Sequence, residues 1–344
     1  MRERRWGYEK SPALANQQLR HQLLPTKFEK SLKQQWTQVA LLLVLGLTLI
    51  TAELVAETPQ QGHYPQAWLF VRLRSCQIIS YIILTTNQET GCYVFKAKRL
   101  GAIAISTAAS ILHQKPQSGI RILSYHAVGT KVDGDVNSIY SLKTDEFRMH
   151  CDLIEQFSDQ YAIPIVPFGT FSENGITLTF DDGYVDALSV VGPELSKRKI
   201  PFHVFVSPGK ALSKDPRYLS PVELVELASI SGATIGSHGY SHVPLTKLSA
   251  TDMLQELIKS KDSLEQILQS PIHTMSYPFG LVNDVVRAAA EKSGFTQAAC
   301  SKWGFVLPIT DRLMQPRVDI WSGDSKSTYL QKLAGTWNWF SRIT

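Results

Sequence analysis

Short apolar runs that suit β-strands recur along the chain from Ile120 onward, and they alternate with longer segments of helical period. The alternation predicts strands at residues 120–126, 163–166, 176–180, 202–206, 233–236, 274–277, 296–300 and 313–318. Helices are expected over residues 145–160, 184–198, 220–230, 251–269, 282–293 and 325–334. Strand and helix in turn, with polar residues at strand ends, are typical of an α/β barrel with its site on the C-terminal face.

The first third of the chain has a different pattern. Residues 1–37 are a polar, basic tail, and an apolar run follows over residues 38–56. That run is about 18 residues long, close to the length that crosses a bilayer. The basic tail predicts an N-terminus on the inside, so the rest of the chain would face the periplasm or the cell exterior. The alternative is a buried core helix, because Glu53 would be costly near the hydrocarbon of a bilayer.

Residues 57–117 give no consistent topology. The apolar stretch from Trp68 to Thr86 carries Arg72 and Arg74, which leaves too short an uncharged run for a membrane span. The run from Leu100 to Leu112 has the length of a signal-peptide core. A linker-like segment then leads into one main domain, expected over residues 118–344.

Composition narrows the class of protein. With 44% hydrophobic and 19% charged residues, the 344-residue chain is globular rather than disordered. The net charge of +5 arises largely in the basic tail, which argues against a nucleic-acid partner for the main domain. The four cysteines form no Cys-x-x-Cys pair and indicate neither a zinc knuckle nor a disulfide framework.

Two strand ends carry candidate chemistry. The strand at 176–180 runs into Asp181, Asp182 and Gly183, and adjacent carboxylates are costly unless a cation or a proton separates their roles. The strand at 233–236 leads to His238 and His242, whose spacing allows them to share a metal. The alternatives are a solvated Asp-Gly turn and structural histidines, but the two features together are more specific than either alone.

These segments resemble the motifs of the polysaccharide deacetylase family, the NodB-homology carbohydrate esterases. Thr179–Gly183 and Ser237–His242 are similar to its first two motifs, and Ser276–Gly280 is similar to the third. Ile122–Val128 resembles the first strand of the exopolysaccharide de-N-acetylase branch. The resemblance covers residues 118–344 and implies a distorted (β/α)7 TIM-like barrel, the glycoside hydrolase-deacetylase fold, here preceded by the membrane-anchor segment.

The resemblance also implies roles for individual residues. Asp182, His238 and His242 would bind a divalent metal, with zinc first and cobalt, nickel or manganese as alternatives. Asp181 would be the general base, and a backbone N–H near Phe279 would stabilise the oxyanion. The remaining substrate contacts would come from two tyrosines, Tyr184 and Tyr277.

Two departures from the family pattern leave alternatives open. Ser276 stands where the third motif has an arginine, and Arg317, fixed by Asp319, could supply that guanidinium or be a surface ion pair. The late Leu-x-x-His motif has no counterpart, so His126 could be the general acid, or protonated Asp181 could return the proton.

Other aromatic residues have weaker indications. His203 is interpreted as structural. The tryptophans at 303 and 321 could stack on sugar rings, whereas those at 337 and 339 would pack a terminal helix.

The function expected from these features is that of a membrane-anchored, metal-dependent hydrolase. It would remove N-acetyl groups from polysaccharides or oligosaccharides that contain N-acetylglucosamine. A degenerate carbohydrate-binding barrel with little activity is the first alternative. A metal hydrolase acting on another amide or ester is the second.

Overall fold

The computed structural model describes residues 91–112, 115–132, 134–135 and 137–342. Contacts divide the chain into Met1–Cys76 and Gln77–Thr344, and the described residues lie in the second unit. Its strands are β1 (Gly119–Tyr125), β2 (Ala127–Val128), β3 (Ser141–Leu142), β4 (Asn174–Phe180), β5 (Phe202–Val206), β6 (Ala233–Ser237), β7 (Thr274–Ser276), β8 (Gln297–Trp303) and β9 (Gln315–Asp319). Its α-helices are α3 (Gly91–Leu112), α4 (Thr144–Tyr161), α5 (Gly192–Lys197), α6 (Pro208–Ala211), α7 (Pro221–Ser229), α8 (Ala250–Leu268), α9 (Asp284–Lys292) and α10 (Lys326–Ala334). The shorter helical turns are η2 (Ala187–Val191), η3 (Leu245–Lys247), η4 (Pro278–Gly280) and η5 (Asn338–Arg342).

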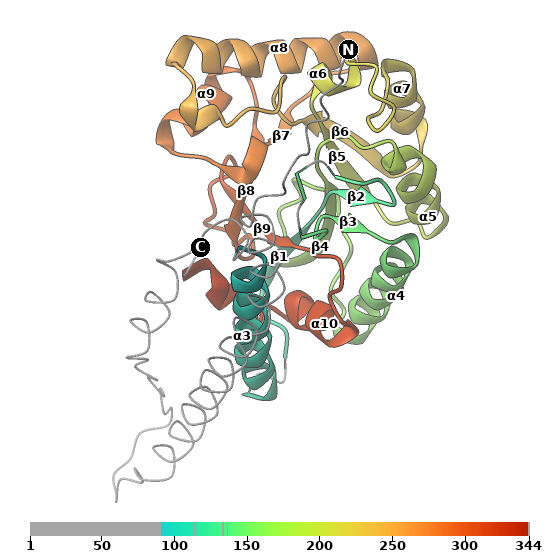
Figure 1. Ribbon diagram of the computed structural model, residues 1–344, viewed down its shortest axis with the longest axis vertical. Helices are drawn as coiled ribbons and strands as arrows, with labels where there is room; N and C mark the ends of the chain where they lie inside the picture. The colour runs from blue at the N-terminus through green and yellow to red at the C-terminus, as the bar shows by residue number, and fades with distance from the viewer. Residues whose placement is uncertain (1–90, 113–114, 133, 136, 343–344) are drawn as a thin grey trace, which may run out of the picture. The chain divides into compact units, whose positions relative to one another are not determined.

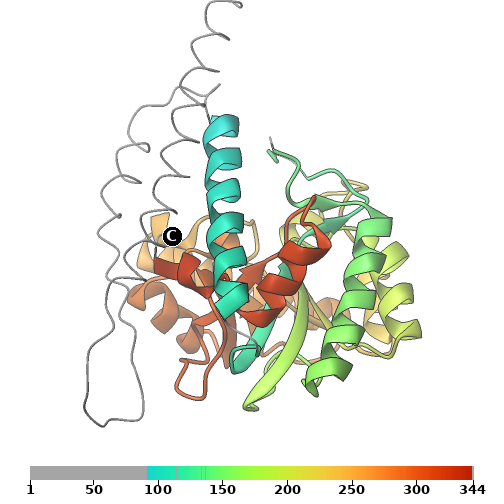
Figure 2. The same ribbon diagram turned by 90° about the horizontal axis from the view of Figure 1, so that it is seen from below.

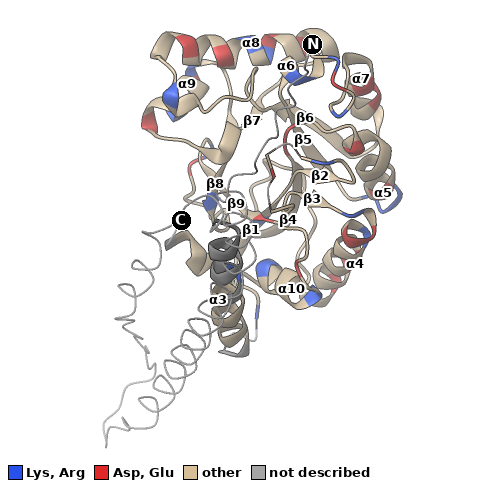
Figure 3. Cartoon of the chain, viewed as in Figure 1, with Lys and Arg blue, Asp and Glu red and all other residues tan. Residues whose placement is uncertain are grey.

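Seven parallel strands close into a barrel in the order β1-β4-β5-β6-β7-β8-β9. The seam between the last strand and the first pairs Leu123 with Val318. Figure 1 shows the larger helices arranged around these strands. In the view of Figure 3, acidic and basic residues lie mainly on those outer helices. The predicted seven-stranded α/β barrel is therefore confirmed.

The barrel strands form from apolar runs because both of their faces are covered. Every residue of β1 and β5 is buried, between the barrel interior on one side and the outer helices on the other. Capping residues define the helices between them. Ser220 and Glu223 form a reciprocal capping box at the start of α7, and the Ser249 side chain accepts a hydrogen bond at the start of α8.

The predicted strand at 163–166 is wrong. This segment makes a single isolated bridge, between Ile165 and Ile176, and does not join the barrel. Pro164 and Pro167 flank the bridge, and a proline has no N–H to donate to a strand ladder. Without this run, the remaining seven predicted strands are the seven strands of the barrel.

The helix predicted over 184–198 is shorter than expected. The chain first turns through Tyr184, then forms the π-helical η2, and only then α5. Asp186 precedes η2, and its Oδ2 accepts hydrogen bonds from the N–H groups of Val128 and Thr130. This carboxylate ties the start of the helical segment to the loop after β1.

Helix α3 packs along the C-terminal part of the chain, as Figure 2 shows. Arg99 forms a 3.0 Å ion pair with the buried Asp324, and the Ser110 hydroxyl lies 3.3 Å from Thr336. Within the described residues, no helix combines the length and the apolar character needed to span a bilayer. The predicted anchor at 38–56 lies outside the described residues.

The tryptophans at 303, 321, 337 and 339 form packing contacts within the C-terminal part of the chain. Trp303 and Trp321 are both nearly inaccessible, with ring centroids 5.5 Å apart, and each packs against Trp337 and Phe340. The idea that Trp303 and Trp321 stack on sugar rings is therefore wrong, because a buried indole presents no face to a ligand. Trp339 packs on Phe340, in agreement with the terminal packing role.

Candidate active site

Two carboxylates leave the end of β4 in a sharp turn. The Asp181 N–H donates to the Tyr125 carbonyl at 2.9 Å, which continues the pairing with β1. Asp182 and Gly183 both adopt φ of +74°, a conformation that is unfavourable for an aspartate. A Cβ on Gly183 would come within 3.1 Å of Val206, so both space and conformation favour glycine. The turn sends the two acids to different partners.

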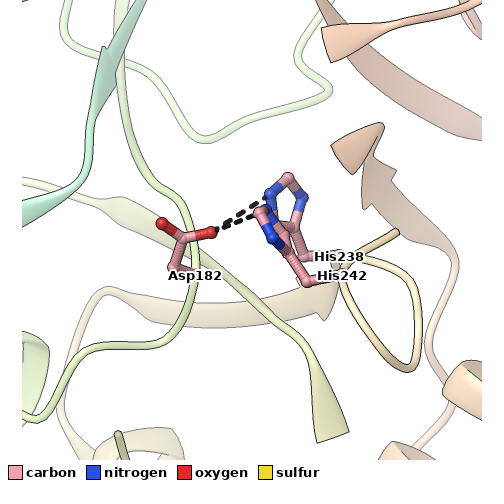
Figure 4. A group of neighbouring side chains, drawn as sticks. All are labelled: Asp182, His238 and His242. Atoms are coloured by element: carbon pink, nitrogen blue, oxygen red, sulfur yellow. Dashed lines mark ion pairs between the residues drawn. The ribbon is translucent and has the colours of Figure 1, made fainter. Parts of the chain in front are cut away.

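Two histidines follow β6 and face Asp182 (Figure 4). His238 Nε2 lies 3.5 Å and His242 Nε2 lies 3.0 Å from the same oxygen, Oδ1 of Asp182. His238 Nδ1 donates to the Ser276 carbonyl at 2.9 Å, which leaves Nε2 as the unprotonated nitrogen. The Asp182 carboxylate has its pKa lowered to about 2, because hydrogen bonding and charge from the histidines outweigh the opposing effect of burial.

This triad fits a divalent cation. One ligand atom from each of Asp182, His238 and His242 lies within 4.8 Å of the others. A histidine whose Nδ1 donates to a carbonyl is oriented as metal-binding histidines usually are. Burial lowers the pKa of His238 to about 4, so its ring is neutral and able to ligate at neutral pH. Two imidazoles and one carboxylate are a donor set suited to zinc and to other first-row metals.

Asp181 is paired with Arg317 on β9, and its Oδ2 also lies 4.0 Å from Nε2 of His238 in the triad. The guanidinium donates two hydrogen bonds to its carboxylate, at 2.8 Å from Nη1 and 2.7 Å from Nη2, and both side chains are buried. Burial alone would raise the pKa of Asp181, but the charge of Arg317 lowers it well below its ordinary value. The Ser276 hydroxyl adds a 3.2 Å hydrogen bond. Asp181 is thus held ionised and in one orientation.

Arg317 is positioned by groups other than the one expected. Its Nε donates to the Cys300 carbonyl at 3.2 Å, and Nη1 lies 3.5 Å from the Thr179 hydroxyl. The expectation that Asp319 fixes Arg317 is wrong for hydrogen bonding, because within the described residues the guanidinium donates to these atoms and to Asp181, while Asp319 acts on Arg317 only through its charge. The alternative of a surface ion pair is also wrong, since Arg317 is only 2% exposed.

A cavity of about 410 Å³ lies over both carboxylates. Its walls come from the C-terminal ends of the barrel strands and the loops that follow them. The lining residues that the sequence predicted are Asp181, Asp182, His238, His242, His126, Tyr184, Phe279 and Arg317. The structure therefore brings eight of the nine predicted site residues to one cavity.

The ninth residue, Tyr277, points elsewhere. Its side chain is fully buried, and its hydroxyl donates to the Leu313 carbonyl at 2.8 Å. Burial raises the pKa of this phenol above its ordinary value. The prediction of a substrate contact through the Tyr277 side chain is wrong, because a strand-end tyrosine alternates in direction with its neighbours and this one faces the helical layer.

The predicted residues around the triad have distinct surroundings. Phe279 is 55% exposed at φ +58°, with its ring 4.7 Å from that of His242. His126 lies just after β1, with its ring 4.5 Å from Tyr140. His203 lies apart from the cavity, where its Nε2 is 2.9 Å from the Thr274 hydroxyl, as expected for a structural histidine.

Several residues that line the cavity were not among the predicted site residues. Ser124, Tyr140, Lys210 and Tyr218 all contribute to the cavity wall. Ser124 precedes the end of β1 and could have been found from the strand-end rule. The others lie in loops or in the four-residue helix α6, where no periodic pattern exists.

Comparisons with known proteins agree with this site. Residues 168–298 match the family model described as polysaccharide deacetylase. The chain is 28% identical over 229 residues to "Putative polysaccharide deacetylase YxkH" of Bacillus subtilis (strain 168), which covers 65% of this chain and 78% of that protein.

Solved structures share the fold. The Streptococcus pyogenes deacetylase PplD in complex with acetate has a TM-score of 0.54 at 21% identity, covering 63% of this chain and 99% of that one. A de-N-acetylase from Aggregatibacter actinomycetemcomitans has a TM-score of 0.52 at 16% identity, covering 63% of this chain and 100% of that one. At these identities the likeness establishes the barrel alone.

Proposed function

We propose, for a chain whose residues 168–298 belong to the polysaccharide deacetylase family, a metal-dependent hydrolase activity on N-acetylated sugars. The substrate would be a polysaccharide or oligosaccharide that contains N-acetylglucosamine, and the products would be acetate and a free amine on the sugar. The observation that carries the proposal is the separation of two adjacent carboxylates. Asp182 faces two histidines, while Asp181 is held by Arg317.

Asp182, His238 and His242 would hold the cation. When bound there, a divalent ion would lower the pKa of a water molecule and polarise the acetyl carbonyl. Asp181 remains ionised beside Arg317 and can accept a proton from the attacking water. The histidines and the cation would balance the negative charge of the adjacent Asp182, so Asp181 can stay charged beside it. Arg317 fixes the direction of the Asp181 oxygens and so acts as a positioning residue.

His126 is the candidate for the proton that the leaving nitrogen needs. It lines the same cavity as Asp181, and its Nδ1 is buried without a hydrogen-bond partner among the described residues. A ring nitrogen that is not engaged by the fold can carry a proton to a substrate atom. Cleavage of the amide C–N bond would then transfer one proton to nitrogen while the acetyl group leaves as acetate.

The sugar specificity rests on weaker support. The cavity walls include two accessible aromatic residues, the half-buried Tyr140 and the exposed Phe279, which can pack on a pyranose ring. The name of one structural relative specifies a de-N-acetylase, which agrees with removal of an N-linked acetyl group.

Two variants of the adjacent acids test the proposal. Asp182→Asn should lose bound metal and acetate release together, because a triad ligand is gone. Asp181→Asn should keep its metal and still lose acetate release, because only the base is removed. Elemental analysis and acetate release from N-acetylglucosamine oligomers measure the two quantities. Full activity of either purified variant would refute the assignment.

A carbohydrate-binding barrel without activity is the second candidate. The missing late histidine motif favours it, whereas the Arg317–Asp181 pair counts against it because the guanidinium is present on another strand. Oligosaccharide binding with metal retained and no acetate release would decide for it.

For either function we also propose that the apolar run at 38–56 anchors the chain to a membrane with the barrel outside.

A further inference from the structure

The first histidine of the metal triad, His238, is held at three points. Its backbone N–H donates to the Val206 carbonyl at 2.8 Å, directly after the pairing of β5 with β6. Its own carbonyl accepts a 2.8 Å hydrogen bond from the Ser207 hydroxyl, and its Nδ1 donates to the Ser276 carbonyl. The ends of β5 and β7 therefore fix this ligand without help from the outer helices.

The second histidine, His242, has no comparable support from the barrel. Within the described residues its ring forms no hydrogen bond beyond the contact of Nε2 with Asp182. Its φ of +56° lies in the left-handed region, which a residue with a side chain adopts only where its surroundings hold it there. The position of this ligand thus depends on what holds the short loop between the two histidines.

Glu256 of α8 holds that loop next to His242. Both of its carboxylate oxygens bind Ser241: Oε1 accepts the backbone N–H, and Oε2 accepts the hydroxyl at 3.0 Å. Ser241 leads directly into His242, so the pair of hydrogen bonds fixes the residue from which the ligand is suspended. Hydrogen bonds to an ionised carboxylate are stronger than those to a neutral acceptor.

The Glu256 carboxylate has no other partner. It forms no ion pair within the part of the chain that the structure describes, whereas Glu265 on the same helix pairs with Lys261. A half-buried carboxylate that binds only a loop acts on the position of that loop. The role of Glu256 therefore differs from that of a surface ion pair, which contributes little to any site.

Two further contacts align α8 with the same loop. The hydroxyl of Ser260, one turn after Glu256, lies 2.7 Å from the hydroxyl of Ser237 at the end of β6, and both side chains are buried. The ammonium group of Lys259 lies 3.7 Å from the centre of the Tyr240 ring. Helix α8 is thus fixed relative to the start of the loop, and Glu256 can hold its end in a defined place.

We propose that Glu256 is a positioning residue of the metal site, which sets the affinity of the triad for its cation by fixing His242 through Ser241. This inference rests on the proposed metal-dependent function and adds to it a residue on an outer helix. Glu256 touches neither the cation nor the substrate. Groups that orient a ligand from behind typically change metal affinity by about 10–100-fold.

Metal binding by the purified full-length protein tests the role. Equilibrium dialysis gives the Kd for zinc, and the visible absorption of the cobalt(II)-loaded protein reports the geometry of the ligands. The proteins compared are the wild type, Glu256→Ala, Glu256→Gln and Asp262→Asn. Asp262 is exposed on the same helix and has no hydrogen bond or ion pair within the described residues, so its removal matches the change of charge.

We expect Glu256→Ala to raise the Kd for zinc by about 10-fold or more and to shift the cobalt spectrum. Glu256→Gln keeps the shape and can still accept the Ser241 N–H, so it should recover most of the affinity, and Asp262→Asn should match the wild type. The melting temperature of the metal-free protein should change little in all three variants, because Ser241 is exposed.

Three results would overturn the role of Glu256. One is a wild-type Kd in a folded Glu256→Ala protein, and another is an equal rise of Kd in Asp262→Asn. The third is a weaker affinity with an unchanged cobalt spectrum and a lower melting temperature of the metal-free protein, which would indicate a merely structural contact.

The two proposals fail separately, because one is measured by acetate release and the other by metal binding. If the wild type binds zinc but releases no acetate, and Glu256→Ala weakens zinc binding, the hydrolase assignment fails and the positioning role stands. If the wild type releases acetate with zinc and Glu256→Ala binds zinc as tightly, the hydrolase assignment stands and the positioning role fails.

Discussion

Replacement of Arg317 by methionine should damage stability and activity for the same physical reason. Arg317 and Asp181 are 2% and 3% exposed and share two hydrogen bonds of 2.8 and 2.7 Å. The substitution leaves Asp181 buried without its counter-ion, and breaking a buried pair in this way costs about 3–5 kcal/mol of unfolding free energy. For a domain of this size the melting temperature should fall by roughly 10 °C.

The effect on activity follows from the loss of orientation. A correctly placed general base contributes a factor of about 10²–10⁴, so we expect Arg317→Met to lower kcat by at least about 100-fold. Arg317→Lys should recover part of the stability but less of the activity, because an ammonium cannot form the two parallel hydrogen bonds. Bound metal should be retained in both variants, because Arg317 does not contact the triad.

Thermal unfolding, elemental analysis and acetate release measure the three quantities. Arg198→Met is the matched control, since Arg198, the C-cap residue of α5, also has carboxylate partners, but Asp152 and Glu155 among them are exposed, and exposed ion pairs contribute about 1 kcal/mol or less. Adding Asp181→Asn to Arg317→Met should restore stability without restoring activity, because the unpaired buried charge is gone. A folded Arg317→Met protein with wild-type kcat would refute the positioning role.

Three further perturbations test the frame around the site. Gly183→Ala should cost about 1–2 kcal/mol, because φ is +74° and Val206 lies 3.1 Å from the new Cβ, and equilibrium dialysis should show weaker metal binding. Burial lowers the pKa of His150 to about 4 in the folded protein, whereas the pKa of an unfolded histidine is 6.5. Between pH 6.5 and 4 the unfolded chain therefore binds more protons than the folded one. The free energy of unfolding should fall by up to about 3 kcal/mol as the pH is lowered through this range. His150→Phe should flatten that acid limb in urea titrations, since phenylalanine keeps the ring that stacks on Tyr329; an unchanged slope contradicts this cause. A chelator should lower the melting temperature of the wild type but not of Asp182→Asn, because only the former gains stability from bound metal.

The sequence predicted those strands and site residues whose signal lies within one short segment of the chain. Apolar runs predicted all seven barrel strands because most residues of each strand are buried, and the strand ends placed Asp181, Asp182 and the two histidines. The same rule overpredicted at 163–166, since hydropathy does not register that Pro164 lacks a donor. Tyr277 was misassigned because a one-residue step along a strand reverses the side-chain direction. No pattern in the sequence marks Lys210, which reaches the cavity wall only because the closed barrel brings separate loops together.

Arg317 shows why the departure at Ser276 does not weaken the site. β7 and β9 are both neighbours of β8, so a side chain from either strand can reach the barrel interior near Asp181. Ser276 on β7 is small, and its hydroxyl and carbonyl bind Asp181 and His238. The volume that a larger residue at 276 would occupy is then open to the guanidinium from β9. The proposed base on β4 thus receives its cation from β9, which only β1 separates from β4 in the closed barrel, and the identity of residue 276 alone could not reveal this.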